Sequence, residues 1–341
     1  FDPYTIHEAV GQRLSDLMFD PLVDVTPGGN YEPALAEKWQ IEKSGTAVRF
    51  FLRKNVNWHP GVGAPEGRKL TAADVIATIR VLLSSDSDIP NSERFNGIAS
   101  AEKIDDHTVL VHMLRAQVDP LRSLIFKILP QHVLGAAPGL KRGSKLAKHP
   151  IGTGPYQFIK ANSQGEILLK ANANYFKGEP KIPRIVMKSY ADQNIMAQSL
   201  MFNSLDLITY VSPRDLTEIL GDRKLGVVPY DALSFSFFAL NTSRGVLKDK
   251  RVRQAISYAV NRKEMLQAFF QGKGRLITGP FPPTSWAYNL DVKGLDYDVN
   301  KAKNLLTAAG LKDGNGDGVI ESSAGKPVKL VFAVPLAGES E

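Results

Sequence analysis

Two short segments constrain this chain more than any others: a glycine-rich turn at residues 151–156 and a patterned stretch at residues 251–262. The first reads Ile-Gly-Thr-Gly-Pro-Tyr, a composition that predicts a turn leading into a strand. The second places apolar side chains three and four residues apart, which predicts an amphipathic helix. Its inward side chains are Val252, Ala255, Ile256, Ala259 and Val260. Neither segment has a pattern typical of catalysis.

Strand-like and helix-like patterns alternate along the chain. Val48, Phe50 and Leu52 fall on one face of a period-two run, which predicts a half-buried strand. Residues 71–74 have the spacing of a capping box in front of an apolar stripe, which predicts a helix. Further strands are expected at 22–25, 108–114, 156–160, 166–170, 185–189 and 233–240, and further helices at 11–20 and after Asp192, Asn261 and Asp298. The order is not strictly βαβ, so we expect α/β or α+β lobes between which the chain passes more than once.

The composition sets limits on the class of protein. With 341 residues, 43% of them hydrophobic, the chain is long enough for two or three domains with their own cores. No run of eighteen apolar residues occurs, so no membrane-spanning helix is expected. The chain has no cysteine, which excludes disulfides, thiol catalysis, zinc–thiolate sites and iron–sulfur clusters.

The net charge of +7 raises the possibility of an anionic partner. Residues 141–149 form a basic run without acidic residues, but glycines and a proline surround it. The run also lacks the interleaved aromatic residues on which bases stack. We therefore expect a solvated loop and no nucleic-acid partner.

Known catalytic and nucleotide-binding motifs are missing from the sequence. There is no P-loop, no dinucleotide-binding fingerprint and no G-x-S-x-G elbow. His107 and His112 stand five residues apart at a strand, on opposite faces, which argues against a shared metal. His59 precedes a Pro-Gly turn, and we expect it to make hydrogen bonds at the surface.

Residues 313–321 match the first half of a calcium loop, with oxygen ligands at positions 1, 3 and 5 and glycine at position 6. The twelfth position should be a bidentate glutamate, but it is Ala324. Asn-Gly and Asp-Gly pairs also form tight turns without metal. We favour a plain turn and expect no metal site and no cofactor.

Aromatic residues offer two candidate binding surfaces. Phe235, Phe237 and Phe238 lie in the apolar stretch 233–240, where a core role is favoured over ligand contact by pattern alone. Trp286 and Tyr288 follow the proline-rich residues 279–283, a rigid segment that can present a flat face to a ligand or simply pack on the surface.

Several motifs, taken in order, resemble one protein family. Residues 36–59 are similar to a segment of the type LAESW…FHLRKGVKFHDG, and residues 70–75 are similar to an FTAEDV helix start. Residues 151–180 resemble GTGPY…N-x-x-Y-W-x-G-x-P, and residues 249–262 and 297–306 continue the series. These are motifs of the extracellular solute-binding proteins of family 5, the periplasmic dipeptide- and oligopeptide-binding components of ABC transporters. Together they cover essentially the whole chain.

The resemblance implies a two-lobed α/β periplasmic binding protein fold of type II, in the large three-domain peptide-binding class. Residues 1–30 and 150–242 would form lobe I, residues 31–149 an accessory domain, and residues 243–341 the start of lobe II. Family members are considerably longer, so we expect the C-terminal portion to be missing here. For the same reason we expect residues 1–341 alone not to bind ligand normally.

The resemblance also implies which residues meet the ligand in the cleft between the lobes. The opening segment aligns where family members line the pocket, and it contributes Ile6, His7, Glu8 and Ala9. A strand crossing the cleft would contribute Phe235, Phe237 and Ala239, with Asn241 at the hinge. The remaining expected contacts are Phe95, Trp286 and Tyr288.

The implied function is binding without chemistry: a monomer that captures dipeptides or oligopeptides and delivers them to the permease subunits of an ABC importer. It would be periplasmic, or attached to the cell surface through an N-terminal lipid. An oligosaccharide, a metal chelate or an opine could replace the peptide, and His7 with Glu8 makes a charged or chelated ligand conceivable. A peptide-holding chaperone and a hydrolase are alternatives from other classes.

Overall fold

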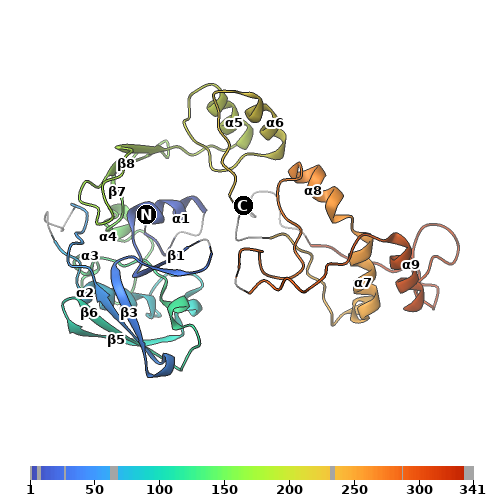
Figure 1. Cartoon of the computed structure of the whole chain (residues 1–341), viewed down its shortest axis with the longest axis horizontal. Helices are drawn as coiled ribbons and strands as arrows, with labels where there is room; N and C mark the ends of the chain where they lie inside the picture. The colour runs from blue at the N-terminus through green and yellow to red at the C-terminus, as the bar shows by residue number, and fades with distance from the viewer. Residues whose placement is uncertain are drawn as a thin grey trace. The chain divides into compact units, whose positions relative to one another are not determined.

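A computed structural model describes residues 2–5, 9–26, 28–61, 68–230, 235–285 and 287–333. The chain divides into two compact units, Phe1–Ser189 and Tyr190–Glu341 (Figure 1). The predicted division into two lobes and an accessory domain has different boundaries and stays a prediction. Among the described residues, no helix combines the length and apolar character needed to cross a bilayer.

The described residues of unit 1 form three antiparallel sheets. The largest has the order β3-β4-β6-β5, a second pairs β1 with β2, and the third has the order β7-β8-β9. The strands are β1 (Val23–Val25), β2 (Tyr31–Pro33), β3 (Ala36–Glu42), β4 (Ala47–Leu52), β5 (Ile98–Asp105), β6 (Thr108–Met113), β7 (Tyr156–Ala161), β8 (Ile167–Ala171) and β9 (Arg184–Met187). The strands predicted near residues 22–25, 48–53, 108–114, 156–160, 166–170 and 185–189 are therefore confirmed.

The helices of unit 1 are short. They are α1 (Ala9–Met18), α2 (Ala72–Leu82), α3 (Gln131–Leu134) and α4 (Lys145–Lys148), with the 3-10 turns η1 (Lys43–Gly45), η2 (Ser92–Phe95) and η3 (Pro120–Leu124). The predicted capping box starts α2: the Thr71 N–H donates to Asp74 Oδ2 at 2.8 Å, and the acid also favours the helix N-terminus. Helix α2 packs against β5 and β6.

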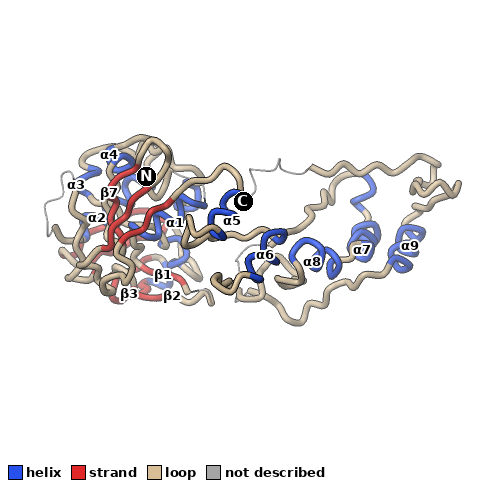
Figure 2. Tube along the Cα trace, turned by 90° about the horizontal axis from the view of Figure 1, so that it is seen from above, coloured by secondary structure: helices blue, strands red, loops and turns tan. Residues whose placement is uncertain are grey.

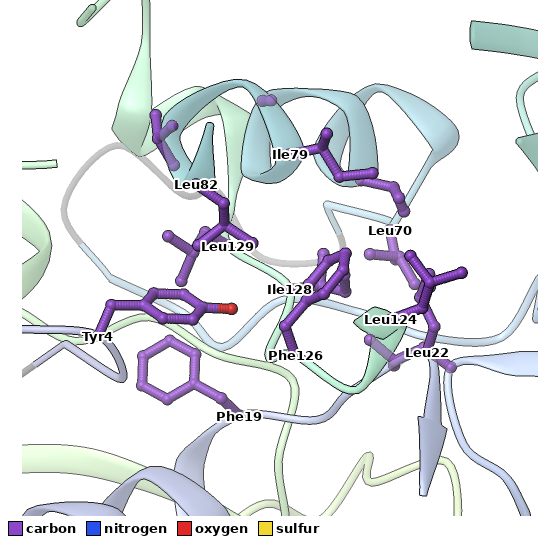
Figure 3. Close-up of a cluster of buried hydrophobic side chains, with 14 of the residues drawn as sticks. Tyr4, Phe19, Leu22, Leu70, Ile79, Leu82, Leu124, Phe126, Ile128 and Leu129 are labelled. Atoms are coloured by element: carbon purple, nitrogen blue, oxygen red, sulfur yellow. The ribbon is translucent and has the colours of Figure 1, made fainter. Parts of the chain in front are cut away.

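One continuous core joins these elements. Figure 3 shows side chains from distant parts of the sequence meeting there, among them Tyr4, Phe19, Ile79, Phe126 and Leu129. Burial of this apolar surface is the main stabilising contribution available to a chain without disulfides.

In unit 2 the described residues form helices and loops but no strand, as Figure 2 shows by colour. The helices are α5 (Gln193–Met201), α6 (Pro213–Gly221), α7 (Lys250–Ala259), α8 (Arg262–Phe270) and α9 (Val299–Ala308), with η4 (Gly245–Lys248). The predicted caps are present: Asp192, Asn261 and Asp298 each accept a backbone N–H of the following helix. Helix α7 packs against α9, with Val252, Ala255 and Ala302 buried.

The strand predicted at residues 233–240 is wrong for the residues that the structure describes there, 235–240, which are irregular. A strand needs a neighbour to satisfy its backbone N–H and C=O groups. The described part of unit 2 offers no strand with which residues 235–240 could pair. The stretch is apolar, as the sequence indicates, but among the described residues the pairing that turns such a stretch into a strand is absent.

Candidate ligand-binding site

The opening segment is anchored immediately before the predicted ligand contacts. Asp2 is buried, and its carboxylate accepts the N–H groups of Tyr4 at 3.0 Å and Thr5 at 2.8 Å. The Tyr4 hydroxyl donates to the Lys127 carbonyl. Ile6, His7 and Glu8 lie outside the described residues, and Ala9 is the first residue of α1. The predicted contacts thus follow directly on a buried, hydrogen-bonded anchor.

Phe95 is in the core of unit 1. Its ring packs edge-on between Tyr4, at 6.2 Å, and Phe126, at 6.1 Å between ring centroids, and only 3% of it is exposed. Its direct contact with ligand stays a prediction. The position indicates that Phe95 supports Tyr4 and, through it, the segment that carries the other predicted contacts.

The aromatic segment at 235–240 is exposed within unit 2. The rings of Phe235 and Phe237 lie 5.4 Å apart, yet Phe237 is 71% exposed. Phe238 turns instead to Phe332, at 6.2 Å. Ala239 is exposed. Residues 235–240 make no backbone hydrogen bond to any residue that the structure describes.

Asn241 and Tyr288 lie in turns of unit 2. The Asn241 side chain accepts the N–H of Ser243 at 3.0 Å, which ends the aromatic segment with a turn. The Tyr288 hydroxyl lies 3.3 Å from Thr278 Oγ1. Trp286 is outside the described residues.

Arg262 fixes the loop that carries Tyr288. Its guanidinium donates to the carbonyls of Ile277 at 3.2 Å and Leu295 at 2.8 Å, on either side of the loop. Arg262 is the last residue of the 251–262 segment. This part of the motif therefore holds a loop in place and does not belong to the apolar face of the helix.

The other conspicuous motif is a junction within unit 1. Gly152 and Gly154 run against the last carbonyl of α1, and the Gly154 N–H donates to Met18 O at 2.9 Å. A Cβ on Gly152 would lie 1.8 Å from that oxygen, so no other residue fits. His59 also contacts both glycines of this junction.

His59 is buried, so the expectation of a surface histidine is wrong. Its ring bridges the turn: the Gly152 N–H donates to Nδ1 at 3.3 Å, and Nε2 lies 2.8 Å from the Gly154 carbonyl. Because Nδ1 accepts, the proton must be on Nε2. Burial lowers the pKa of His59 to about 4, which keeps the ring neutral at pH 7. Only the predicted hydrogen bonding is confirmed.

A buried carboxylate completes this junction. Asp20 accepts the hydroxyl protons of Thr153 at 2.8 Å and Tyr175 at 2.9 Å. Burial raises the pKa of Asp20, while the two hydroxyl hydrogen bonds oppose that rise. The motif residue Thr153 is thereby tied to the end of α1. The glycine turn is recognisable in the sequence, but no local pattern indicates that His59 binds its glycines or that Asp20 binds Thr153.

The acidic loop in unit 2 gathers carboxylate oxygens of Asp313, Asp317 and Glu321 within 4.8 Å of one another. Both oxygens of Asp313 already accept backbone N–H groups, from Gly316 and Gly318. Such bonds are those of a turn that needs no metal. The preference for a plain turn stays a prediction.

Comparisons with known proteins identify the family of this chain. Residues 30–340 match the family described as bacterial extracellular solute-binding proteins, family 5 Middle. The chain belongs to this family. The two-lobed α/β fold expected from the motifs is confirmed by the oligopeptide-binding protein AppA of Bacillus subtilis in complex with a nonapeptide, at a TM-score of 0.75 and 28% identity, over 95% of this chain and 64% of that one.

Two relatives match at similar identity. The heme-binding protein A of Haemophilus influenzae is 30% identical over 92% of this chain and 60% of its own length. The dipeptide-binding protein of Escherichia coli is 31% identical over 83% of this chain and 55% of its own length. The chain thus spans somewhat more than half the length of these relatives.

Proposed function

We propose that this chain is part of the ligand-binding component of an ABC importer, which captures dipeptides or oligopeptides and passes them to membrane permease subunits. The observation that carries the proposal is the family match over residues 30–340, together with relatives named for dipeptide and oligopeptide binding. The role is binding and release rather than catalysis, and the protein acts in the periplasm or at the cell surface.

The segment 235–240 supports a peptide as ligand. Its backbone N–H and C=O groups are unused within the described residues, and a peptide main chain offers the complementary groups. Phe237 adds an exposed aromatic face that a ligand side chain can cover. Main-chain pairing gives affinity without regard to ligand sequence, which suits an importer of varied peptides.

A metal chelate is the second candidate ligand. The heme-binding relative from Haemophilus influenzae supports it, because it matches this chain as well as the dipeptide-binding relative does. His7 and Glu8 are the residues of the predicted site that suit such a ligand.

The substitution Phe237→Ala tests the proposed site in the natural protein that contains this chain. We expect the dissociation constant for the tightest binder in a dipeptide panel to rise about tenfold or more, because buried aromatic contacts are frequent hot spots. Calorimetry measures the change. Phe202→Ala is the matched control, since Phe202 is also highly exposed in unit 2 but lies outside the segment. If the Phe237→Ala variant and the unaltered protein bind with equal affinity, Phe237 is not part of the ligand-binding site.

A further inference from the structure

Unit 1 has a recess of about 750 Å³, and none of the predicted ligand contacts that the structure describes lines it. It opens between η2, the end of β6 and the start of η3. The volume is within the range of small-molecule sites. The residues that line it include Glu93, Leu114, Arg115, Gln117, Val118 and Asp119.

Two glycines fix the wall of the recess. The Leu114 N–H donates to the Gly97 carbonyl at 2.9 Å, and the Gln117 N–H donates to the Gly45 carbonyl at 3.2 Å. A Cβ would lie 2.3 Å from the Gln117 carbonyl oxygen at Gly45, and 2.6 Å from Gln117 Nε2 at Gly97. The loop 114–119 therefore packs so closely against Gly45 and Gly97 that neither position has room for a Cβ. A wall held in this way loses little freedom when a ligand binds.

The recess presents charges of both signs. Neither Glu93 nor Arg115 has an ion-pair partner among the residues that the structure describes. Asp119 is held in place by the Tyr31 hydroxyl, which donates to Oδ2 at 2.5 Å. This bond leaves the second carboxylate oxygen of Asp119 to meet a ligand.

Apolar side chains stand beside these charges. Leu114 is 67% exposed, and Val118 at the tip of the loop is fully exposed. Both line the recess. An apolar group bound against them would remove this surface from water, which is favourable in proportion to the area covered.

We propose that this recess binds a small zwitterion with an apolar side chain, of the free amino-acid type. Arg115 holds the carboxylate, Glu93 and Asp119 hold the ammonium group, and Leu114 with Val118 covers the side chain. All the residues of this site belong to unit 1, and none of them belongs to the segment 235–240.

L-leucine is the probe, and NMR titration of the folded chain is the measurement. We expect saturable shifts of the Gly97 and Val118 amide signals. Leucinamide lacks the carboxylate and isocaproate lacks the ammonium group, and each should bind about tenfold more weakly, because each loses a charge-assisted hydrogen bond. Arg115→Gln should weaken leucine binding by a similar factor. Lys54→Gln removes the same charge from an exposed residue elsewhere in unit 1 and should change nothing.

Three results would each overturn the proposal. The first is the absence of a saturable shift up to about 10 mM leucine, a concentration well above a dissociation constant of about 1 mM. The second is unchanged leucine binding by Arg115→Gln, with a native circular dichroism spectrum. The third is equal binding of leucine and its two analogues. None of these results bears on peptide binding, which the Phe237→Ala variant tests separately.

Discussion

Gly152→Ala is expected to destabilise unit 1 by about 4 kcal/mol or more, enough to unfold many domains. The added Cβ would lie 1.8 Å from the carbonyl oxygen of Met18. That oxygen is a backbone atom at the end of α1, so it cannot move aside as the end of a flexible side chain could. The junction must open, which separates the glycine turn from the helix and exposes the core beside it.

Urea unfolding followed by tryptophan fluorescence measures this effect, since Trp39 and Trp58 are in unit 1. Gly28→Ala is the matched control: its nearest atoms would be 3.7 Å from the new Cβ, so we expect a change within about 0.5 kcal/mol. Gly154→Ala, with backbone contacts from 2.6 Å, should fall on the destabilised side. A Gly152→Ala protein as stable as the control would show that the junction is looser than its geometry indicates.

Acid is expected to destabilise unit 1 through His59. The pKa of His59 is about 4 in the folded chain and about 6.5 when unfolded, so the folded state binds fewer protons between these values. The stabilisation is therefore complete above pH 6.5 and is lost as the pH falls toward 4. At about 1.4 kcal/mol for each pKa unit, the loss approaches about 3 kcal/mol.

His59→Gln isolates this contribution. The variant should be less stable at pH 7, because it loses part of the bridge to Gly152 and Gly154, but its free energy of unfolding should change less between pH 7 and 4. The raised pKa of Asp20 acts with the opposite sign, favouring the folded state as the pH falls. Both proteins contain Asp20, so the difference between their pH profiles removes its effect. His149→Gln, at an exposed site, is the control. Parallel profiles for His59→Gln and the unaltered chain would contradict the assignment.

Local signals in the sequence were sufficient for most elements of the fold. Asp192, Asn261 and Asp298 cap helices because a side-chain oxygen can satisfy an N–H of the first turn whatever the rest of the chain does. Val48, Phe50 and Leu52 occupy every second position of β4, so they share one face of the strand, and that face is buried while Arg49 and Phe51 on the other face are half-buried.

The predictions that were wrong concern residues whose surroundings depend on partners distant in sequence. His59 was expected at the surface because a Pro-Gly turn follows it, but its partners Gly152 and Gly154 are more than ninety residues away. The segment 235–240 is mostly apolar, yet the described part of unit 2 supplies no neighbouring strand. The sequence around Phe95 has no feature that distinguishes an aromatic residue of the core from one that contacts ligand.

Native mass spectrometry of the natural protein as purified from its host, with identification of whatever it releases on denaturation, tests peptide capture most directly. We expect a set of short peptides that compete with an added dipeptide panel. A single chelate would keep the family and replace the peptide. A protein that carries no small ligand, and that stays empty when peptide and chelate pools are added, would contradict the proposed function.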